Sequence, residues 1–264
     1  MNASTVQKLR DIHCSAMAEE LEAQMRNPGI YASMGFEDRL ARIVDAESDR
    51  RRKAKLQRYI KSADFDLSTA CIEDIEYLPE RKLDKAQILR FASCEFIDAG
   101  HNIVLKGASG SGKSYIAQAI GNAACRKFKK VKYIRMPALL DELATAKATG
   151  EFRDTIKSYQ KLDLLIIDEW LIRCLEKQES YDLLEIVDAR SNAEPGGSMI
   201  LCTQYNDDEW YERIDPEAAE GSPISEAVMD RIINNSEEVM IESRTSMRKR
   251  HGIAGRSGKG GAHE

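Results

Sequence analysis

The stretch GASGSGKS, residues 107–114, lies between a short apolar run, NIVLK (102–106), and a segment of helical composition, YIAQAIGNAACRKF (115–128). Its spacing, G-x-x-x-x-G-K-[ST], is that of a phosphate-binding loop, which requires a strand before it and a helix after it. The glycines let backbone amides turn toward a β-phosphate, and the start of the helix adds partial positive charge. Lys113 would reach the β- and γ-phosphates, and the Ser114 hydroxyl would bind Mg²⁺. We therefore expect a nucleotide site formed by Gly107, Ala108, Ser109, Gly110, Ser111, Gly112, Lys113, Ser114 and Tyr115.

From residue 102 onward, short runs of strand-forming residues alternate with helical stretches. Nearly continuous apolar strands separated by helices are typical of a parallel sheet that is covered on both faces. The sequence therefore predicts an α/β nucleotide-binding architecture. Its expected strands are residues 102–106, 131–136, 162–168, 198–203 and 238–242.

The apolar run LDLLIIDEW, residues 162–170, ends in two carboxylates, Asp168 and Glu169. A carboxylate at the carboxyl end of a strand beside the phosphate loop is placed to hold the metal ion. We expect Asp168 to hold Mg²⁺ through water and Glu169 to orient or deprotonate the attacking water. This pair favours hydrolysis over phosphoryl transfer. The alternative is that Asp168 only caps the next segment.

Two later positions complete a catalytic set. Gln204 follows the strand SMILCT and could donate a hydrogen bond to a γ-phosphate oxygen or the attacking water, with Thr203 as a nearby alternative. The segment SPISEAVMDRIINN predicts a helix with Ser222 as its N-cap and Pro223 at its first position. Arg231 lies on the apolar face of that helix. It either pairs with a buried carboxylate or reaches a phosphate bound to another molecule, and the spacing favours neither.

The N-terminal part has helical composition over about residues 5–25 and 37–62, with a break at NPG (27–29). In the second helix, an apolar stripe of Leu40, Ile43 and Val44 continues into a basic one. Residues 50–61 contain seven basic side chains and no acidic one, which suits contact with the phosphates of duplex DNA, although a solvated helix face is the alternative. The expected contacts are Arg50, Arg51, Arg52, Lys53, Lys55 and Arg58.

The composition of the chain limits the classes of protein to which it can belong. The chain has 264 residues, 42% of them hydrophobic, and a net charge of −5, values of an ordinary globular protein. The sequence begins without an apolar core of signal-peptide length, and its apolar runs are too short to span a membrane, so we expect a cytoplasmic protein without a membrane partner. Six scattered cysteines without a Cys-x-x-Cys pair predict reduced thiols rather than a zinc site. We divide the chain into a helical part for DNA binding and assembly (1–66), an ATPase domain (67–250) and a basic glycine-rich tail expected to be disordered (251–264).

The order GASGSGKS, LLIIDEW, ILCTQ and AVMDRI, preceded by EDIEYLPERKLDKAQI, resembles the IstB-like transposition helper ATPases of insertion sequences. These are relatives of the DnaC-type helicase loaders in the AAA+ superfamily. The resemblance covers about residues 39–250. It implies a five-stranded parallel sheet, ATP-driven homo-oligomers with active sites shared between subunits, binding to double-stranded DNA, and delivery of target DNA to a transposase.

By the same resemblance, Lys113, Ser114, Asp168 and Glu169 are the Walker residues, Gln204 stands at the sensor position, and Arg231 stands at the arginine-finger position. About twenty residues follow the last expected strand, so the lid is short or absent. A second sensor arginine, Arg244 or Arg248, is therefore in doubt.

Two alternatives stay open. A DnaC-like helicase loader would share the ATPase machinery and differ in its partner. A P-loop kinase acting on a small molecule would need a lid with arginines, and it would not need Glu169 directly after the metal-binding Asp168.

Overall fold

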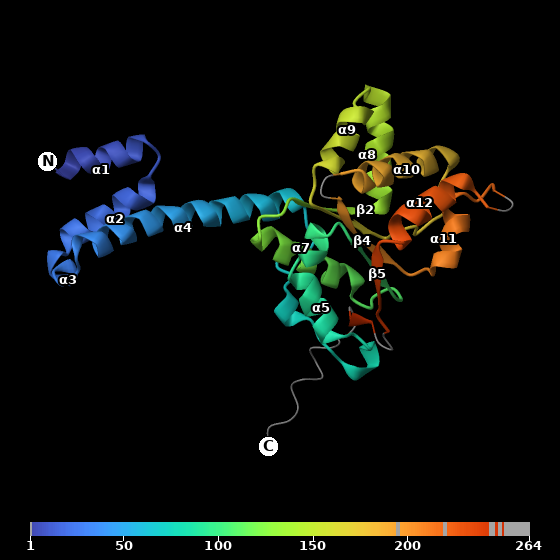
Figure 1. Cartoon of the computed structure of the whole chain (residues 1–264), viewed down its shortest axis with the longest axis horizontal. Coiled ribbons are helices and arrows are strands. Elements are labelled where there is room, and N and C mark those ends of the chain that lie inside the picture. The colour runs from blue at the N-terminus through green and yellow to red at the C-terminus, as the bar shows by residue number, and fades with distance from the viewer. Residues whose placement is uncertain (1, 194–195, 219–220, 243–245, 248–249, 251–264) are drawn as a thin grey trace, which may run out of the picture. The chain divides into compact units, whose positions relative to one another are not determined.

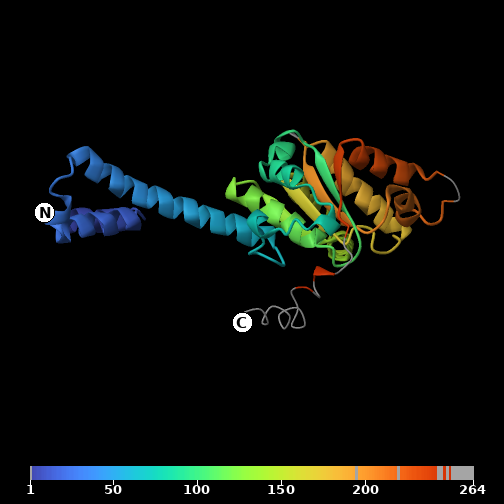
Figure 2. The ribbon, with the colours of Figure 1, turned by 90° about the horizontal axis from the view of Figure 1, so that it is seen from below.

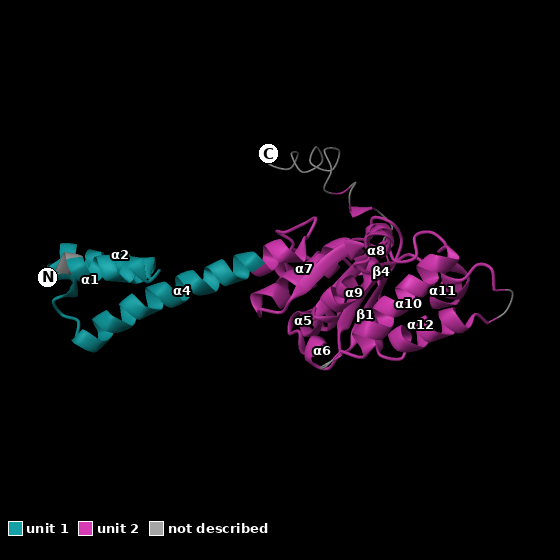
Figure 3. Ribbon diagram, turned by 90° about the horizontal axis from the view of Figure 1, so that it is seen from above, with its two compact units in different colours: residues 1–58 teal, residues 59–264 magenta. Residues whose placement is uncertain are grey.

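The computed structural model describes residues 2–193, 196–218, 221–242, 246–247 and 250, and it divides into two compact units, residues 1–58 and 59–264 (Figures 1 and 3). No helix in the described part of the chain is both long enough and apolar enough to cross a membrane.

The first unit is helical. It contains α1 (Asn2–Asp11), α2 (Ser15–Arg26), α3 (Pro28–Tyr31) and most of α4 (Phe36–Ala63).

The expectation of one helix over residues 5–25 is wrong, because the chain turns between α1 and α2. His13 adopts a left-handed conformation there, with φ of 61°. The turn brings Arg10 within 2.8 Å of Glu22, twelve residues away, and buries Val6 and Ala18. A continuous helix would separate these two charges by more than three turns.

The apolar stripe expected on α4 is only partly buried. Ile43 packs into the unit, whereas Leu40 and Val44 are 44% and 48% exposed.

The second unit is built on one five-stranded parallel sheet with the strand order β2-β3-β4-β1-β5. Every expected strand is present, and the fifth begins two residues earlier than predicted. The strands are β1 (Asn102–Lys106), β2 (Val131–Arg135), β3 (Leu164–Asp168), β4 (Ser198–Thr203) and β5 (Ser236–Met240).

Helices cover both faces of this sheet, as the apolar strands require. Figure 1 shows α5 and α7 on one side of the strands and α8, α9, α10 and α12 on the other, and Figure 2 shows the same layers from below. The helices are α5 (Lys85–Ala92), α6 (Glu95–Asp98), α7 (Lys113–Arg126), α8 (Met136–Thr149), α9 (Phe152–Gln160), α10 (Lys177–Ser191), α11 (Asp207–Ile214) and α12 (Pro223–Ile233), with short 3₁₀ turns at Ile72–Asp74 and Pro79–Arg81.

Alternate residues of each strand supply the two cores. Leu165 and Ile167 of β3 join a cluster with Leu183 of α10 and Val228 of α12. On the other face, Ile166 lies against α7, so close that a Cβ at Gly121 would come within 2.7 Å of its Cδ1 atom. The sheet is thus fixed from both sides, and the carboxyl ends of β1, β3 and β4 meet at one edge.

Candidate nucleotide site

The phosphate loop connects the end of β1 to the start of α7. Gly112 is the residue before the helix and has φ of 96°, a conformation that side chains with a Cβ rarely adopt. At Gly107 a Cβ would lie 2.4 Å from the backbone oxygen of Ile241, which cannot move aside. Glycine is therefore required at both positions, and the loop has the strand–loop–helix context that its sequence predicted.

Lys113 points back along the loop. Its Nζ atom donates hydrogen bonds to the backbone oxygens of Gly107 and Ala108, at 2.7 and 2.9 Å. The ammonium group is therefore held directly over the loop, where phosphate oxygens would be cradled.

A small cavity of about 90 Å³ gathers the predicted catalytic residues other than Arg231. They come from three places that are distant in sequence, namely the phosphate loop, the end of β3 and the end of β4. The cavity is lined by Ser109, Gly110, Lys113, Ser114, Asp168, Glu169, Trp170, Ile172, Cys202, Thr203 and Gln204. We call this cavity the phosphate pocket.

Asp168 is the last residue of β3 and is buried. Its Oδ1 accepts a hydrogen bond from the Glu169 amide at 2.8 Å, and its Oδ2 accepts one from the Tyr133 hydroxyl at 2.9 Å. The next helix, α10, begins at Lys177 with Glu176 at its N-cap, so Asp168 does not cap it. Burial and the nearby charge of Asp168 raise the pKa of Tyr133, so its hydroxyl keeps its proton and is the donor.

Glu169 follows in a left-handed conformation, with φ of 55°, and Leu171 is similar at 53°. Left-handed backbone is uncommon for residues other than glycine and collects at functional sites. Behind them, Trp170 and Trp210 are buried with their ring centroids 5.5 Å apart, so both tryptophans are core residues.

The two sensor candidates have different surroundings. Thr203 is buried, and its hydroxyl donates to the Trp170 backbone oxygen at 3.2 Å while accepting from the Tyr205 amide at 3.1 Å. Gln204 is exposed, and its Nε2 atom donates to the Tyr205 hydroxyl at 3.0 Å. Thr203 therefore supports the backbone, and Gln204 presents its amide at the pocket.

The donor set of the phosphate pocket fits Mg²⁺. The Ser114 hydroxyl and the Asp168 carboxylate line the same cavity, and hard oxygen ligands of this kind suit the ion together with phosphate oxygens and water.

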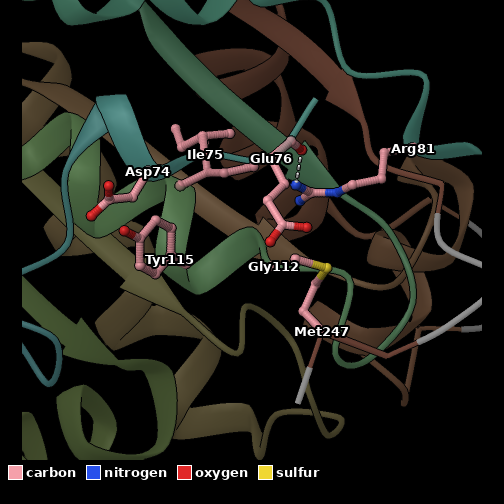
Figure 4. A pocket seen from close by; sticks show the side chains of 8 residues that line it. Asp74, Ile75, Glu76, Arg81, Gly112, Tyr115 and Met247 are labelled. Atoms are coloured by element: carbon pink, nitrogen blue, oxygen red, sulfur yellow. Dashed lines mark hydrogen bonds between the residues drawn. The ribbon is translucent and has the colours of Figure 1, made fainter. Parts of the chain in front are cut away.

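A second, larger cavity of about 390 Å³ is lined by Gly112, the residue next to Lys113 of the phosphate pocket (Figure 4). Its walls come from the segment before α5, from the start of α7 and from the C-terminal part. They are formed by Asp74, Ile75, Glu76, Arg81, Gly112, Tyr115, Ile116 and Met247. We call this cavity the base pocket. Of these residues, only Gly112 and Tyr115 were assigned to the nucleotide from the sequence. Asp74, Ile75, Glu76 and Arg81 belong to the stretch EDIEYLPERKLDKAQI (73–88), which supported the family resemblance without a role of its own.

Arg81 forms one side of the base pocket and is buried. Its guanidinium donates to the backbone oxygens of Glu76 and Ser111, at 2.5 and 2.8 Å, the first of which is drawn in Figure 4. Burial lowers the pKa of Arg81. The Met247 amide donates to the Gly110 oxygen at 2.9 Å. Contacts with two distant segments thus hold the loop at Gly110 and Ser111.

Arg231 does not belong to the phosphate pocket of its own chain. It lies beside Asn102, the first residue of β1, whereas the phosphate loop follows Lys106, the last. Its guanidinium pairs with Asp188 at 2.9 Å and donates to the Ala227 backbone oxygen at 2.9 Å. The partner carboxylate is 46% exposed and is therefore not the buried one that the sequence suggested.

The basic stretch of α4 divides into two groups. Arg50 and Arg51 form ion pairs with the buried Glu47, at 2.5 and 2.7 Å. They also donate to the His13 backbone oxygen and the Cys14 Sγ atom, so they fasten α4 to the turn between α1 and α2. All six predicted DNA contacts are exposed, and the other four lie farther along the helix: Arg52, Lys53, Lys55 and Arg58.

Two further expectations lie outside the described residues. They are the second sensor, Arg244 or Arg248, and the tail at 251–264.

Comparison with known proteins shows the family to which the chain belongs. The family model for the IstB-like ATP binding protein matches residues 7–254. An ATP-binding protein of the insertion sequence IS1162 from Pseudomonas fluorescens is 35% identical over 77% of this chain and 87% of its own length. An insertion sequence ATP-binding protein from Sinorhizobium fredii, y4pL, is 30% identical over 92% of this chain and 96% of its own length.

Solved structures show the same fold. The DnaC helicase loader superposes with a TM-score of 0.54 at 19% identity, covering 66% of this chain and 97% of its own. The second unit thus has the fold of the AAA+ P-loop ATPases. With the family match over nearly its whole length, the chain belongs to the IstB-like ATP-binding protein family.

Proposed function

We propose that this protein is an ATPase that assembles on duplex DNA in the cytoplasm and helps a transposase capture its target during insertion-sequence transposition. The observation that carries the proposal is the phosphate pocket, which gathers Lys113, Ser114, Asp168, Glu169 and Gln204 around about 90 Å³. Membership in the family of insertion sequence ATP-binding proteins supplies the biological context.

ATP fits the two adjoining cavities. The base pocket, with Ile75, Ile116 and the Tyr115 ring in its walls, suits a flat heterocycle, and the phosphate loop beside it suits the phosphate chain. Gly112 belongs to the base pocket and Lys113 to the phosphate pocket, so one nucleotide can occupy both.

Hydrolysis follows from what each side chain can do. Lys113 stabilises the negative charge on the β- and γ-phosphates, and Gln204 donates to an oxygen of the γ-phosphate or of the attacking water. Glu169 holds that water and accepts its proton. Ser114 and Asp168 hold Mg²⁺, which when bound neutralises charge on the phosphate oxygens.

Arg231 acts on a neighbouring subunit in this proposal. It lies at the opposite end of β1 from the phosphate loop, so it cannot complete its own site. In an oligomer it would leave or share Asp188 and reach the nucleotide of the adjacent copy. A guanidinium suits this role because its charge is permanent and its planar fork binds phosphate oxygens.

DNA binding is assigned to the exposed basic residues of α4 that follow Arg51. Arg52, Lys53, Lys55 and Arg58 would contact phosphates, which supplies affinity without sequence preference. The transposase is proposed as partner because the relatives are encoded by insertion sequences. A helicase-loading role remains the second candidate, because a helicase loader shares the fold.

The test combines nucleotide state, salt and partner. Fluorescence anisotropy of a labelled random-sequence duplex should show binding with ATP that is weaker with ADP, and binding by Lys113→Ala should not respond to nucleotide. The double variant Lys53→Ala/Arg58→Ala should flatten the salt dependence of log Kd by about 2, because each phosphate contact contributes about 0.9.

The matched control, Arg153→Ala/Lys161→Ala, removes the same charge from exposed positions of the second unit and should keep the wild-type slope. Pull-down with the transposase of the same element, against a replicative helicase, separates the two candidate partners. DNA binding that ignores nucleotide, or capture of the helicase alone, would contradict the proposal.

A further inference from the structure

Tyr133 is a buried polar residue that the hydrolysis scheme above does not use. It lies on β2, on the face of the sheet covered by α7, and is only 4% exposed. Its hydroxyl is 2.9 Å from Oδ2 of Asp168 and 3.2 Å from Oδ2 of Asp66. One tyrosine thus stands between the metal-holding carboxylate and a second acid.

This arrangement contains one proton and two acceptors. A tyrosine hydroxyl has a single hydrogen to donate, so it serves one carboxylate fully. Asp66 already receives a charged hydrogen bond from Arg135, at 2.7 Å. Asp168 is buried, lies closer to the hydroxyl, and has more to gain from a donor, because a buried charge without partners is costly. The proton therefore points to Asp168.

Asp66 belongs to a segment that is tightly fastened to the second unit. We call residues 64–72 the connector, since they follow α4. Asp64 pairs with Lys132 at 3.0 Å. The Leu67 amide donates to the Gln118 side chain of α7 at 2.6 Å.

Farther along, the Asn122 side chain, also on α7, donates to the backbone oxygens of Ser68 and Ala70, both at 2.9 Å. The polar residues that α7 buries, Gln118 and Asn122, are thus used to hold the connector. The connector leads within a few residues to Asp74 and Glu76, which line the base pocket.

We propose that Tyr133 is a positioning residue that orients Asp168 for Mg²⁺, and that Asp66 of the connector competes for its proton. The inference rests on the proposed ATPase function. It couples the connector to the metal site, because Asp66 of the connector and Asp168 share the single hydroxyl proton of Tyr133.

Titration of Mn²⁺ in the presence of β,γ-methylene ATP tests the proposal without hydrolysis, with free Mn²⁺ measured by electron paramagnetic resonance. Tyr133→Phe should weaken Mn²⁺ binding about tenfold, in line with loss of one hydrogen bond to a charged group. Nucleotide affinity without metal should stay at the wild-type value, since the phosphate loop is intact.

The chain offers a matched control in Tyr159. It is 3% exposed, and its hydroxyl donates to a carboxylate, Glu142, at 2.9 Å, but it does not line the phosphate pocket. Tyr159→Phe makes the same chemical change and should leave Mn²⁺ affinity unchanged. Thermal unfolding of both variants separates a loss of stability from a loss of metal binding.

Asp66→Asn should not weaken Mn²⁺ binding. It removes the competing charge, so Mn²⁺ affinity should stay equal to the wild type or rise up to about threefold. If the hydrogen-bond network were purely structural, both Tyr133→Phe and Asp66→Asn would bind Mn²⁺ more weakly. Wild-type affinity in Tyr133→Phe, or equal weakening in Tyr133→Phe and Asp66→Asn, would overturn the inference. Failure of the wild-type protein to bind metal and nucleotide would instead contradict the proposed function.

Discussion

The two units use their charged residues differently. In the second unit, the charged side chains of the phosphate loop and of β3 line one small pocket, as their motif spacing predicted. In the first unit, two of the six basic residues predicted to contact DNA, Arg50 and Arg51, form ion pairs with Glu47. A motif with fixed spacing predicts a binding site, whereas a run of like charges predicts only the sign of the local charge.

The difference has a physical cause. The phosphate loop is made by backbone geometry over eight consecutive residues, so its sequence contains nearly all the information that shapes it. The role of a basic residue on a helix depends on which carboxylate the fold brings near. For Arg51 that carboxylate is one turn away in sequence, but it is buried only because the helices of the first unit pack together.

The largest effect is expected at Lys113. Lys113→Ala removes the charge that meets the β- and γ-phosphates, so ATP turnover should fall ~10³-fold or more. Calorimetry should show weaker binding of both ATP and tripolyphosphate. Lys157→Ala, an exposed lysine of α9, is the control and should bind both as the wild type does. Tripolyphosphate affinity that survives Lys113→Ala would mean that the loop does not hold the phosphates.

The next largest effect is expected at Arg231. As a residue acting on the neighbouring site, Arg231→Ala should bind ATP normally and hydrolyse it ~10³-fold more slowly. Mixing it with Lys113→Ala should restore part of the activity, because some interfaces then pair an intact loop with an intact arginine.

Asp188→Asn separates the two roles of Arg231. It breaks the ion pair while leaving the guanidinium in place, so turnover should stay within about threefold of the wild type. If Asp188→Asn and Arg231→Ala lose stability and activity equally, Arg231 serves only the fold of its own chain.

A smaller effect should distinguish the base pocket from the phosphate pocket. Met247 lines the base pocket but not the phosphate pocket. Met247→Ala should therefore weaken ATP binding about fivefold through lost apolar contact and leave the affinity for tripolyphosphate unchanged. Equal weakening of both ligands would show that the substitution disturbs the loop, which Met247 contacts through its backbone.

The smallest effect concerns the first unit and its pH dependence. Hydrogen bonds from Arg50 and Arg51 lower the pKa of Glu47 from 4.5 to about 2. A carboxylate with a lowered pKa contributes stability above pH 4.5, and the contribution disappears as pH falls toward 2. Unfolding of the wild type and of Glu47→Gln, followed by circular dichroism, should differ most above pH 4.5 and converge near pH 2. A difference that is constant across this range would exclude the Glu47 ion pairs as its source.

Much of the fold was predictable because β1, β3 and β4 are mainly apolar and helices separate successive strands. The N-cap Ser222 and the first-turn Pro223 of α12 are confirmed, since Ser222 accepts from the Ser225 amide. The break at His13 was not predictable, because nothing in its residue type requires a turn, and only the packing of α1 on α2 explains it.

The candidate site was predictable where short sequence motifs define it. Lys113, Ser114, Asp168, Glu169 and Gln204 meet as expected. The base pocket and the Tyr133–Asp66 contact were missed because they join segments that are far apart in the sequence, and a tyrosine inside a strand looks like any core residue.

ATP turnover by the purified protein, measured with and without duplex DNA, tests the central claim most directly when wild type and Glu169→Gln are compared. The account predicts slow turnover by the wild type that duplex DNA accelerates, and ATP binding by Glu169→Gln at wild-type affinity with turnover at least ~10²-fold lower. Hydrolysis by Glu169→Gln at the wild-type rate would contradict it.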